Sequence, residues 1–198
     1  MQILSNAVQL SHLLIGAAVP AAKTIVDATA GNGGDTLFMA QRAAAGCCIY
    51  AFDVQQAALD TAKARLDAAR QVDAGIAAVK FICDSHEQVD KYVHGRIDLA
   101  VFNLGYLPGG DHALTTRCAG TLAALQKMLK MLSTGGHISI AVYPGHPEGK
   151  REAEAVKEWA RQLPKKFFTA GWYEMVNHGT NAPALCWIEK VGEQIEVS

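Results

Sequence analysis

The chain has 198 residues, a length that suits one domain with a sizeable core. Half of the residues are apolar and the formal net charge is −1, which excludes a large basic surface for sequence-independent nucleic-acid binding but leaves room for a local patch that binds structured RNA. The five cysteines form no Cys-x-x-Cys pair and are odd in number, so we expect buried free thiols and a cytoplasmic protein.

The first twenty residues predict an amphipathic helix that packs on or near the ligand site described below. Residues 13–22 resemble a signal-peptide core, but no Lys or Arg precedes them and polar residues such as Ser11 and His12 interrupt the apolar character. Asn6, with Gln9 three residues later, resembles a capping box. His12 falls on the polar side of this helix and suggests a surface or hydrogen-bonded histidine. No apolar run approaches the length of a membrane span, so no membrane partner is expected.

Strand and helix patterns alternate along the rest of the chain. The expected strands are 24–27, 48–53, 79–83, 97–103 and 137–143. The expected helices are 35–45, 55–71, a short one near 86–92, 115–132 and 149–163, and Gly135-Gly136 is the expected cap after the fourth of them. Two late strand-like runs, 167–176 and 184–190, indicate a hairpin at an antiparallel edge. The pattern predicts a single α/β domain, residues 1–198, with one doubly wound, Rossmann-like, mostly parallel sheet.

A glycine-rich turn joins the first expected strand to a helix. Asp27 closes the strand, the turn spans 28–34, and the next strand ends in a second carboxylate, Asp53. Strand, glycine turn, helix, strand and terminal acid form a nucleotide-like cofactor site in which the second acid accepts hydrogen bonds from ribose hydroxyls. A dinucleotide fingerprint needs a glycine where Thr36 stands, so the spacing favours S-adenosylmethionine over NAD. A turn that merely connects strand to helix is the alternative.

Two further loops leave strands at the same predicted edge of the sheet. Asn103 ends the fourth strand and begins the run 103–111, in which Tyr106 follows three residues later. A carboxamide oxygen beside an aromatic ring suits a nitrogen nucleophile, with the ring stacked on the base that carries it. The loop 143–150 follows the fifth strand and brings His146 to the same cleft. Asn103 as a turn cap and His146 as a solvated loop residue remain open alternatives.

The remaining charged residues give no second site. The only basic concentration is interleaved with glutamates and favours a solvated helix face over an RNA groove; it comprises Lys150, Arg151, Lys157, Arg161, Lys165 and Lys166. His86, His94 and His137 suggest structural or exposed positions, and no spacing of His, Cys and Asp resembles a metal site.

These motifs together resemble the class I methyltransferase superfamily and, within it, a bacterial family long catalogued as ribosomal RNA methylases. The resemblance rests on the blocks 27–36, 52–55, 84–86, 103–111, 143–150 and 181–183, which run in family order. Thr29 stands where the superfamily has glycine, which is typical of this family. Leu104-Gly105 replaces Pro-Pro between Asn103 and Tyr106, and Pro144 stands where many relatives have His. Characterised members methylate the aminomethyl group of the wobble uridine in transfer RNA.

The resemblance implies S-adenosylmethionine as cofactor, S-adenosylhomocysteine as product, and the anticodon region of transfer RNA as partner; a homodimer is left open. It implies that Asp27, Gly31 and Gly33 surround the methionine portion of the cofactor, that Asp53 binds its ribose, and that Asp84 lies near its adenine amine. The full predicted cofactor-binding set is Asp27, Ala28, Thr29, Gly31, Asn32, Gly33, Asp35, Thr36, Asp53, Gln55, Asp84, Ser85 and Asn103. The predicted catalytic set is Asn103 and Tyr106 at the target nitrogen, with Asp111 and His146 as candidate bases.

Two other functions compete with a transfer RNA methyltransferase. An enzyme of similar fold acting on ribosomal RNA or on a small amine fits the near-neutral charge. A catalytically silent nucleotide-binding module fits the glycine turn but leaves Asn103 and Tyr106 without a role.

Overall fold

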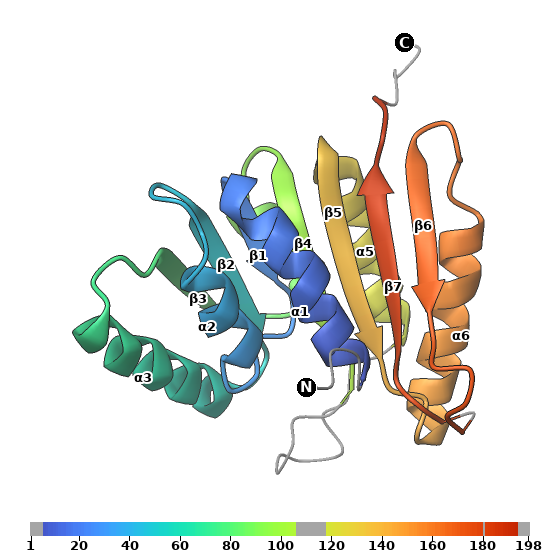
Figure 1. Cartoon of the computed structure of the whole chain (residues 1–198), viewed down its shortest axis with the longest axis horizontal. Helices are drawn as coiled ribbons and strands as arrows, with labels where there is room; N and C mark the ends of the chain where they lie inside the picture. The colour runs from blue at the N-terminus through green and yellow to red at the C-terminus, as the bar shows by residue number, and fades with distance from the viewer. Residues whose placement is uncertain (1–5, 106–117, 180, 194–198) are drawn as a thin grey trace.

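The computed structural model describes residues 6–105, 118–179 and 181–193. Its strands form one seven-stranded sheet in the order β3-β2-β1-β4-β5-β7-β6 (Figure 1). The strands are β1 Thr24–Asp27, β2 Cys48–Asp53, β3 Ala78–Cys83, β4 Ile97–Asn103, β5 Leu132–Val142, β6 Phe168–Tyr173 and β7 Ala184–Lys190. Strands β1 to β5 pair in parallel, whereas β7 is antiparallel to both β5 and β6. The predicted fold class, a doubly wound sheet with an antiparallel C-terminal edge hairpin, is confirmed.

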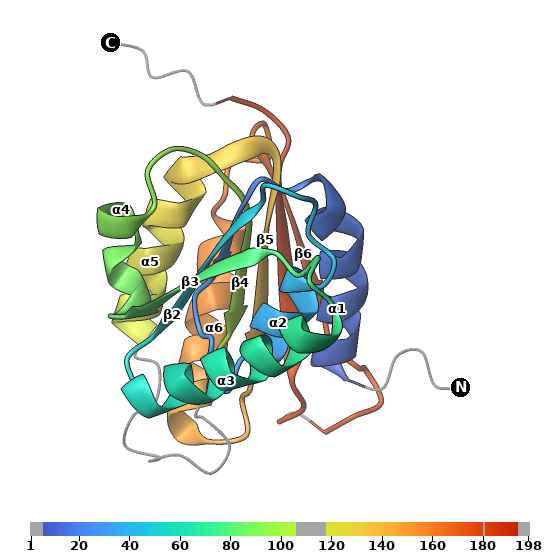
Figure 2. The ribbon, with the colours of Figure 1, turned by 90° about the vertical axis from the view of Figure 1, so that its left-hand side faces the viewer.

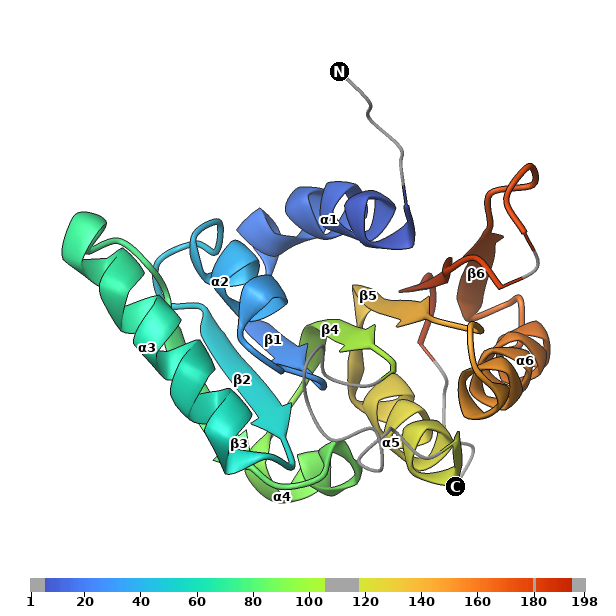
Figure 3. The same cartoon turned by 90° about the horizontal axis from the view of Figure 1, so that it is seen from below.

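Helices cover both faces of this sheet. The helices are α1 Ala7–Ala18, α2 Gly34–Ala40, α3 Gln56–Val72, α4 Val89–Tyr92, α5 Cys118–Met131 and α6 Pro147–Arg161, with short 3-10 turns η1 Val19–Ala21 and η2 His86–Gln88. Figure 2 and Figure 3 show α1, α2 and α3 on one face and α4, α5 and α6 on the other. Helix α1 lies against β5 and β7, far along the chain from its own position.

The alternation of side chains along the central strands builds a core on each face. Ile25 of β1 packs with the apolar side chains of α1, α2 and α3, whereas its neighbour Val26 packs with those of α4, α5 and α6. Successive residues of a strand point to opposite faces, so a strand buried on both sides is apolar throughout. Both side chains are fully buried, and each contributes about 1.5–3 kcal/mol through burial.

The order of the strands places the ligand edge. From β1 the chain winds outward to β2 and β3, and from β4 it winds the other way to β5, so β1 and β4 flank the switch point. Ligands of doubly wound sheets bind beyond the carboxyl ends of the strands at such a point. That edge is the lower one in Figure 1.

The expectation that Gly135-Gly136 caps a helix is wrong. Helix α5 ends at Met131 and β5 begins at the next residue. The pairing of β4 with β5 is displaced over Ser133–Gly136, and Gly135 takes a φ of 77° there. The glycines therefore permit a bulge in β5. Asp98 stabilises the bulge, because its carboxylate accepts a hydrogen bond of 2.8 Å from the Ser133 hydroxyl.

Other bounds differ by a few residues from those expected. Helix α2 stops at Ala40, and α6 begins at Pro147 with His146 as its N-terminal cap. The expectation of buried cysteines holds for Cys47 and Cys186, but Cys83, at the end of β3, is exposed. In the part of the chain that the structure describes, no helix combines the length and the apolar character that crossing a membrane requires.

Candidate functional site

The turn after β1 has a shape that only glycine permits at two positions. Gly31 and Gly33 have φ values of 49° and 77°, in the left-handed region. A Cβ on Gly33 would also lie 2.7 Å from the Cβ of Ala62 in α3. The first turn of α2 therefore packs directly on α3, and this close approach holds the glycine turn against the carboxyl end of β1.

Asp27 is buried beneath this turn, with its side chain hydrogen-bonded inside the protein. Its carboxylate accepts a hydrogen bond from the Thr36 hydroxyl at 2.5 Å and one from the backbone N–H of Thr29 at 3.2 Å. Burial, followed by the charge of Asp35, raises the pKa of Asp27 to about 7. The residue is 1% exposed, so it shapes the turn from within.

Asp53 connects the glycine turn to the start of α3. Its two carboxylate oxygens accept backbone hydrogen bonds from Gly31 and Gln55, each at 2.9 Å. An ionised carboxylate oxygen has a second lone pair, so both oxygens can still accept a hydrogen bond from a ligand. The predicted ribose acceptor thus lies directly beside the glycine turn.

The segment after β3 closes another side of the site. Asp84 accepts hydrogen bonds from the Ser85 N–H at 2.7 Å and from the Tyr92 hydroxyl at 2.8 Å. Burial lowers the pKa of His86, which favours a neutral ring. The carbonyl of Ala28 can only accept, so His86 donates from Nδ1 to it at 2.9 Å. The sequence left open whether His86 is structural or exposed. The structure makes it a structural histidine that supports the glycine turn.

Asn103, at the end of β4, meets the same turn. Its backbone N–H donates to the Thr29 hydroxyl at 2.7 Å, and its Nδ2 donates to Asp35 at 3.2 Å. Asp35 also lies 2.6 Å from Nε2 of His12 in α1. Asp35 therefore links α1 to the carboxamide at the end of β4. Burial raises the pKa of Tyr143, which follows β5, and the side chain of Asn103 lowers it slightly.

Sequence reasoning missed two members of this group. His12 was expected at the surface or hydrogen-bonded, and the structure gives it a carboxylate partner that lies 23 residues away. Tyr143 attracted no role of its own, although it follows β5 at the same edge as Asn103. Burial, and then the charge of Asp35, raise the pKa of Tyr143 to about 12, so its hydroxyl stays protonated at neutral pH.

The other predicted site residues lie at a helix cap, in the turns after β1 and β2, or outside the described residues. His146 caps α6, where its Nδ1 accepts the backbone N–H of Gly149 at 3.1 Å. Asn32 and Gln55 lie partly exposed in the turns that follow β1 and β2. Tyr106 and Asp111 lie outside the described residues.

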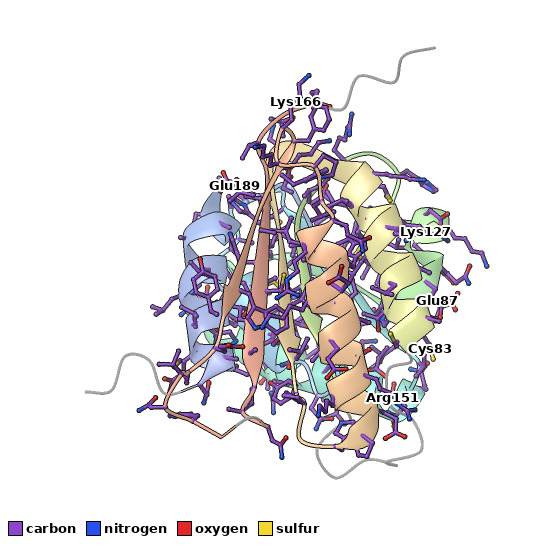
Figure 4. The ribbon with its side chains drawn as sticks, turned by 90° about the vertical axis from the view of Figure 1, so that its right-hand side faces the viewer. Cys83, Glu87, Lys127, Arg151, Lys166 and Glu189 are labelled. Atoms are coloured by element: carbon purple, nitrogen blue, oxygen red, sulfur yellow. The ribbon has the colours of Figure 1, made fainter. Side chains whose placement is uncertain are left out.

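Two of the six basic residues around α6 lie far apart, and two others form ion pairs. Figure 4 shows Arg151 and Lys166 at opposite ends of this helix layer. Between them, Lys157 lies 3.3 Å from Glu174, and Arg161 lies 3.5 Å from Glu158. Ion pairs of this kind describe a solvated helix face.

Comparison with known proteins agrees with this geometry. The model of the family described as "Putative rRNA methylase" matches residues 49–189. The chain belongs to this family. A chloroplastic transfer RNA (mnm5s2U34)-methyltransferase of Arabidopsis thaliana is 34% identical over 195 residues, covering 93% of this chain and 69% of that protein.

Solved structures extend the similarity to the whole fold. A protein from Clostridium thermocellum described as a "putative rRNA-methylase" superposes with a TM-score of 0.88 at 35% identity, covering 96% of this chain and all of the other. A protein from Streptococcus mutans described as a "putative methyltransferase", in complex with S-adenosylhomocysteine, gives a TM-score of 0.83 at 36% identity; the match covers 94% of this chain and 99% of the other. The prediction of an S-adenosylmethionine-dependent methyltransferase is confirmed.

The raised pKa of Asp27 makes the stability of the cofactor-free methyltransferase depend on pH. Folding takes up a proton at Asp27 between about pH 4 and pH 7, so its stabilising contribution is complete below about pH 4 and is lost as the pH rises through about 7. Asp27→Asn keeps the shape and removes the charge. We expect the parent to lose stability relative to this variant as the pH rises from about 4 to about 7, by an amount on the order of a few kcal/mol.

Urea unfolding at several pH values measures this difference. Asp60→Asn, at an exposed position of α3, is the matched control and should follow the parent. Parallel stability curves for the parent and Asp27→Asn would show that Asp27 is ionised in the folded protein throughout this range.

Proposed function

We propose that this chain methylates RNA, and that its substrate is the aminomethyl nitrogen of 5-aminomethyl-2-thiouridine at the wobble position of transfer RNA. The observation that carries the proposal is the Asn103 side chain, which donates to Asp35 at the end of β4 beside the glycine turn. The similarity to the Arabidopsis thaliana transfer RNA methyltransferase supports the choice of nucleoside. The substrate is expected in the cytoplasm, and one domain spanning the chain carries the activity.

The donors and charges around the turn suit S-adenosylmethionine. The cofactor supplies an electrophilic methyl group on a positively charged sulfur. Asp35 and Asp53 both raise the pKa of Asp27 through their charge, which marks the turn as a region of negative potential that favours a cationic ligand. In our proposal Asp53 accepts from the ribose hydroxyls and Asp84 from the adenine amine. The segments 28–36, 55 and 85 complete the cofactor-binding set.

The amine nucleophile needs a residue that aligns its lone pair. The Asn103 carboxamide has one acceptor oxygen and two donor hydrogens. Because Nδ2 is directed at Asp35, the oxygen is directed away from that carboxylate and can accept a hydrogen bond from the incoming N–H. Alignment of this kind accounts for much of the rate of a displacement reaction. In our proposal Tyr106 stacks on the uridine base.

A primary alkyl amine is mostly protonated at neutral pH, so the site must take up its proton. Our candidate bases are Asp111 and His146. In the structure His146 caps α6, because its Nδ1 accepts the backbone N–H of Gly149. We retain both residues as candidates, together with a homodimer as the RNA-binding form.

Nucleoside analysis of transfer RNA tests the substrate. In a strain that lacks the gene, we expect 5-aminomethyl-2-thiouridine to accumulate at the expense of 5-methylaminomethyl-2-thiouridine, measured by mass spectrometry. Complementation with the parent chain restores the methylated form, and complementation with Asn103→Ala does not. An unchanged transfer RNA profile with a lost methyl group in ribosomal RNA or in a small amine would replace the proposed substrate.

Asp53→Ala tests the cofactor site. Loss of a charge-assisted acceptor should weaken S-adenosylmethionine binding by about 1.5–3 kcal/mol, a rise of about tenfold or more in Kd by calorimetry. Asp60→Ala, the exposed control on α3, should bind like the parent, and NAD should bind to neither. Parental affinity in folded Asp53→Ala would remove this residue from the site.

Asn103→Ala separates cofactor binding from methyl transfer. The variant should bind S-adenosylmethionine within a few-fold of the parent, because the carboxamide is not needed to hold adenosine. Single-turnover methylation at saturating RNA should fall by roughly 10²-fold or more, since the nucleophile loses its alignment. A near-parental rate would leave Asn103 with no role beyond the turn.

A further inference from the structure

The N-terminal helix carries a histidine into the site that the sequence gave no catalytic role. Helix α1 is anchored on β5 by a buried hydrogen bond of 2.9 Å between the hydroxyls of Ser11 and Ser139. Ile15, one turn further along, is fully buried. These two contacts hold one face of α1 on the sheet, and they leave His12 at the boundary between α1 and α2.

Two contacts hold the imidazole of His12 in place. Its ring stacks on Phe38 of α2 with a centroid distance of 4.2 Å and an interplanar angle of 11°. Its Nε2 lies 2.6 Å from Oδ1 of Asp35, within the range of a strong, charge-assisted hydrogen bond. The guanidinium of Arg42 also lies 3.8 Å from the Phe38 centroid. Two groups this close to one ring must occupy opposite faces, so Phe38 is clamped and the stack on His12 is fixed.

The second oxygen of Asp35 faces Asn103. An ionised carboxylate can only accept hydrogen bonds, so a carboxylate at this position forces the Asn103 side chain to present its NH₂ group, as the 3.2 Å contact shows. The opposite orientation of the carboxamide would place two acceptors against each other. Asp35 therefore selects between two orientations that have almost the same shape.

We propose that His12 and Asp35 are positioning residues that set the orientation of the Asn103 carboxamide and thereby direct its oxygen to the target nitrogen. His12 donates to Asp35 and keeps that carboxylate in place, and Asp35 accepts from Asn103. This inference rests on the proposed amine methylation for its kinetic test, whereas the orientation itself can be observed without any substrate.

Three variants test the proposal. Asp35→Asn keeps the size of the side chain and adds a donor, so it no longer selects one carboxamide orientation. His12→Phe keeps a ring to stack on Phe38 and removes the donor. His12→Gln returns an N–H donor at similar reach. His94→Phe, at an exposed histidine before β4, is the matched control. Thermal unfolding establishes that each variant is folded.

The first readout is the side-chain amide signal pair of Asn103 in the ¹H–¹⁵N spectrum of the cofactor-free protein, assigned by its absence from Asn103→Ala. We expect this pair to shift in Asp35→Asn and His12→Phe and to stay in place in His94→Phe. The second readout is single-turnover methylation at saturating S-adenosylmethionine. We expect the rate to fall by about tenfold or more in the first two variants and to recover in His12→Gln. In His12→Phe, whose changed residue is not part of the cofactor-binding set, we expect the S-adenosylmethionine Kd to stay within about threefold of the parent.

An unmoved Asn103 signal in both Asp35→Asn and His12→Phe would overturn the proposal, as would a loss of cofactor affinity in His12→Phe as large as its loss of rate. Failure of His12→Gln to restore the rate would also overturn it, because the ring and not the donor would then matter. If the parent methylates no aminomethyl uridine, the proposed substrate fails, while the amide signal still decides the orientation of Asn103.

Discussion

The carboxylate of Asp27 lies buried at the end of β1 and accepts hydrogen bonds from two groups of the turn that follows it. A buried carboxylate without such partners would cost several kcal/mol, so the turn must fold back over β1 to supply the Thr29 N–H and the Thr36 hydroxyl. Thr36 lies in the first turn of α2, and its hydrogen bond therefore fixes where that helix begins. As a result Asp35, one residue earlier, lies within hydrogen-bond distance of Asn103 and His12.

The same constraint explains why the site uses groups from distant parts of the chain. The Thr29 hydroxyl accepts the Asn103 N–H, and the Ala28 carbonyl accepts from His86. Each contact satisfies a polar group of the turn that would otherwise be left unpaired near the core. The turn is thus supported by β4 and by the segment after β3, and these are the segments that present Asn103 and Asp84 to a ligand.

Much of this arrangement is predictable from the sequence. The strand bounds of β1, β2 and β4 follow from apolar runs that end in polar residues, and the positions of Asp27, Asp53 and Asn103 follow from those ends. From the sequence, the glycine pair after the helical stripe of residues 122–132 predicts a helix cap, and only the pairing of β4 with β5 shows that it lies in a bulge. The contact between His12 and Asp35 could not be predicted either. It depends on the angle at which α1 crosses the sheet, and the helical periodicity of residues 7–18 does not determine that angle.

The hydroxyl pair of Ser11 and Ser139 has a consequence for how α1 is placed along its own axis. Apolar burial is non-directional, so Ile15 and its neighbours would tolerate a helix that slid along the groove of the sheet. A slide of one helical turn, about 5.4 Å, would keep an apolar face on β5 while separating the two hydroxyls and leaving both buried without a partner. Ser11 and Ser139 thus fix the position of α1 along its own axis. They contribute little to the free energy of packing α1 on the sheet, but they determine that His12 is the residue of α1 that lies beside α2.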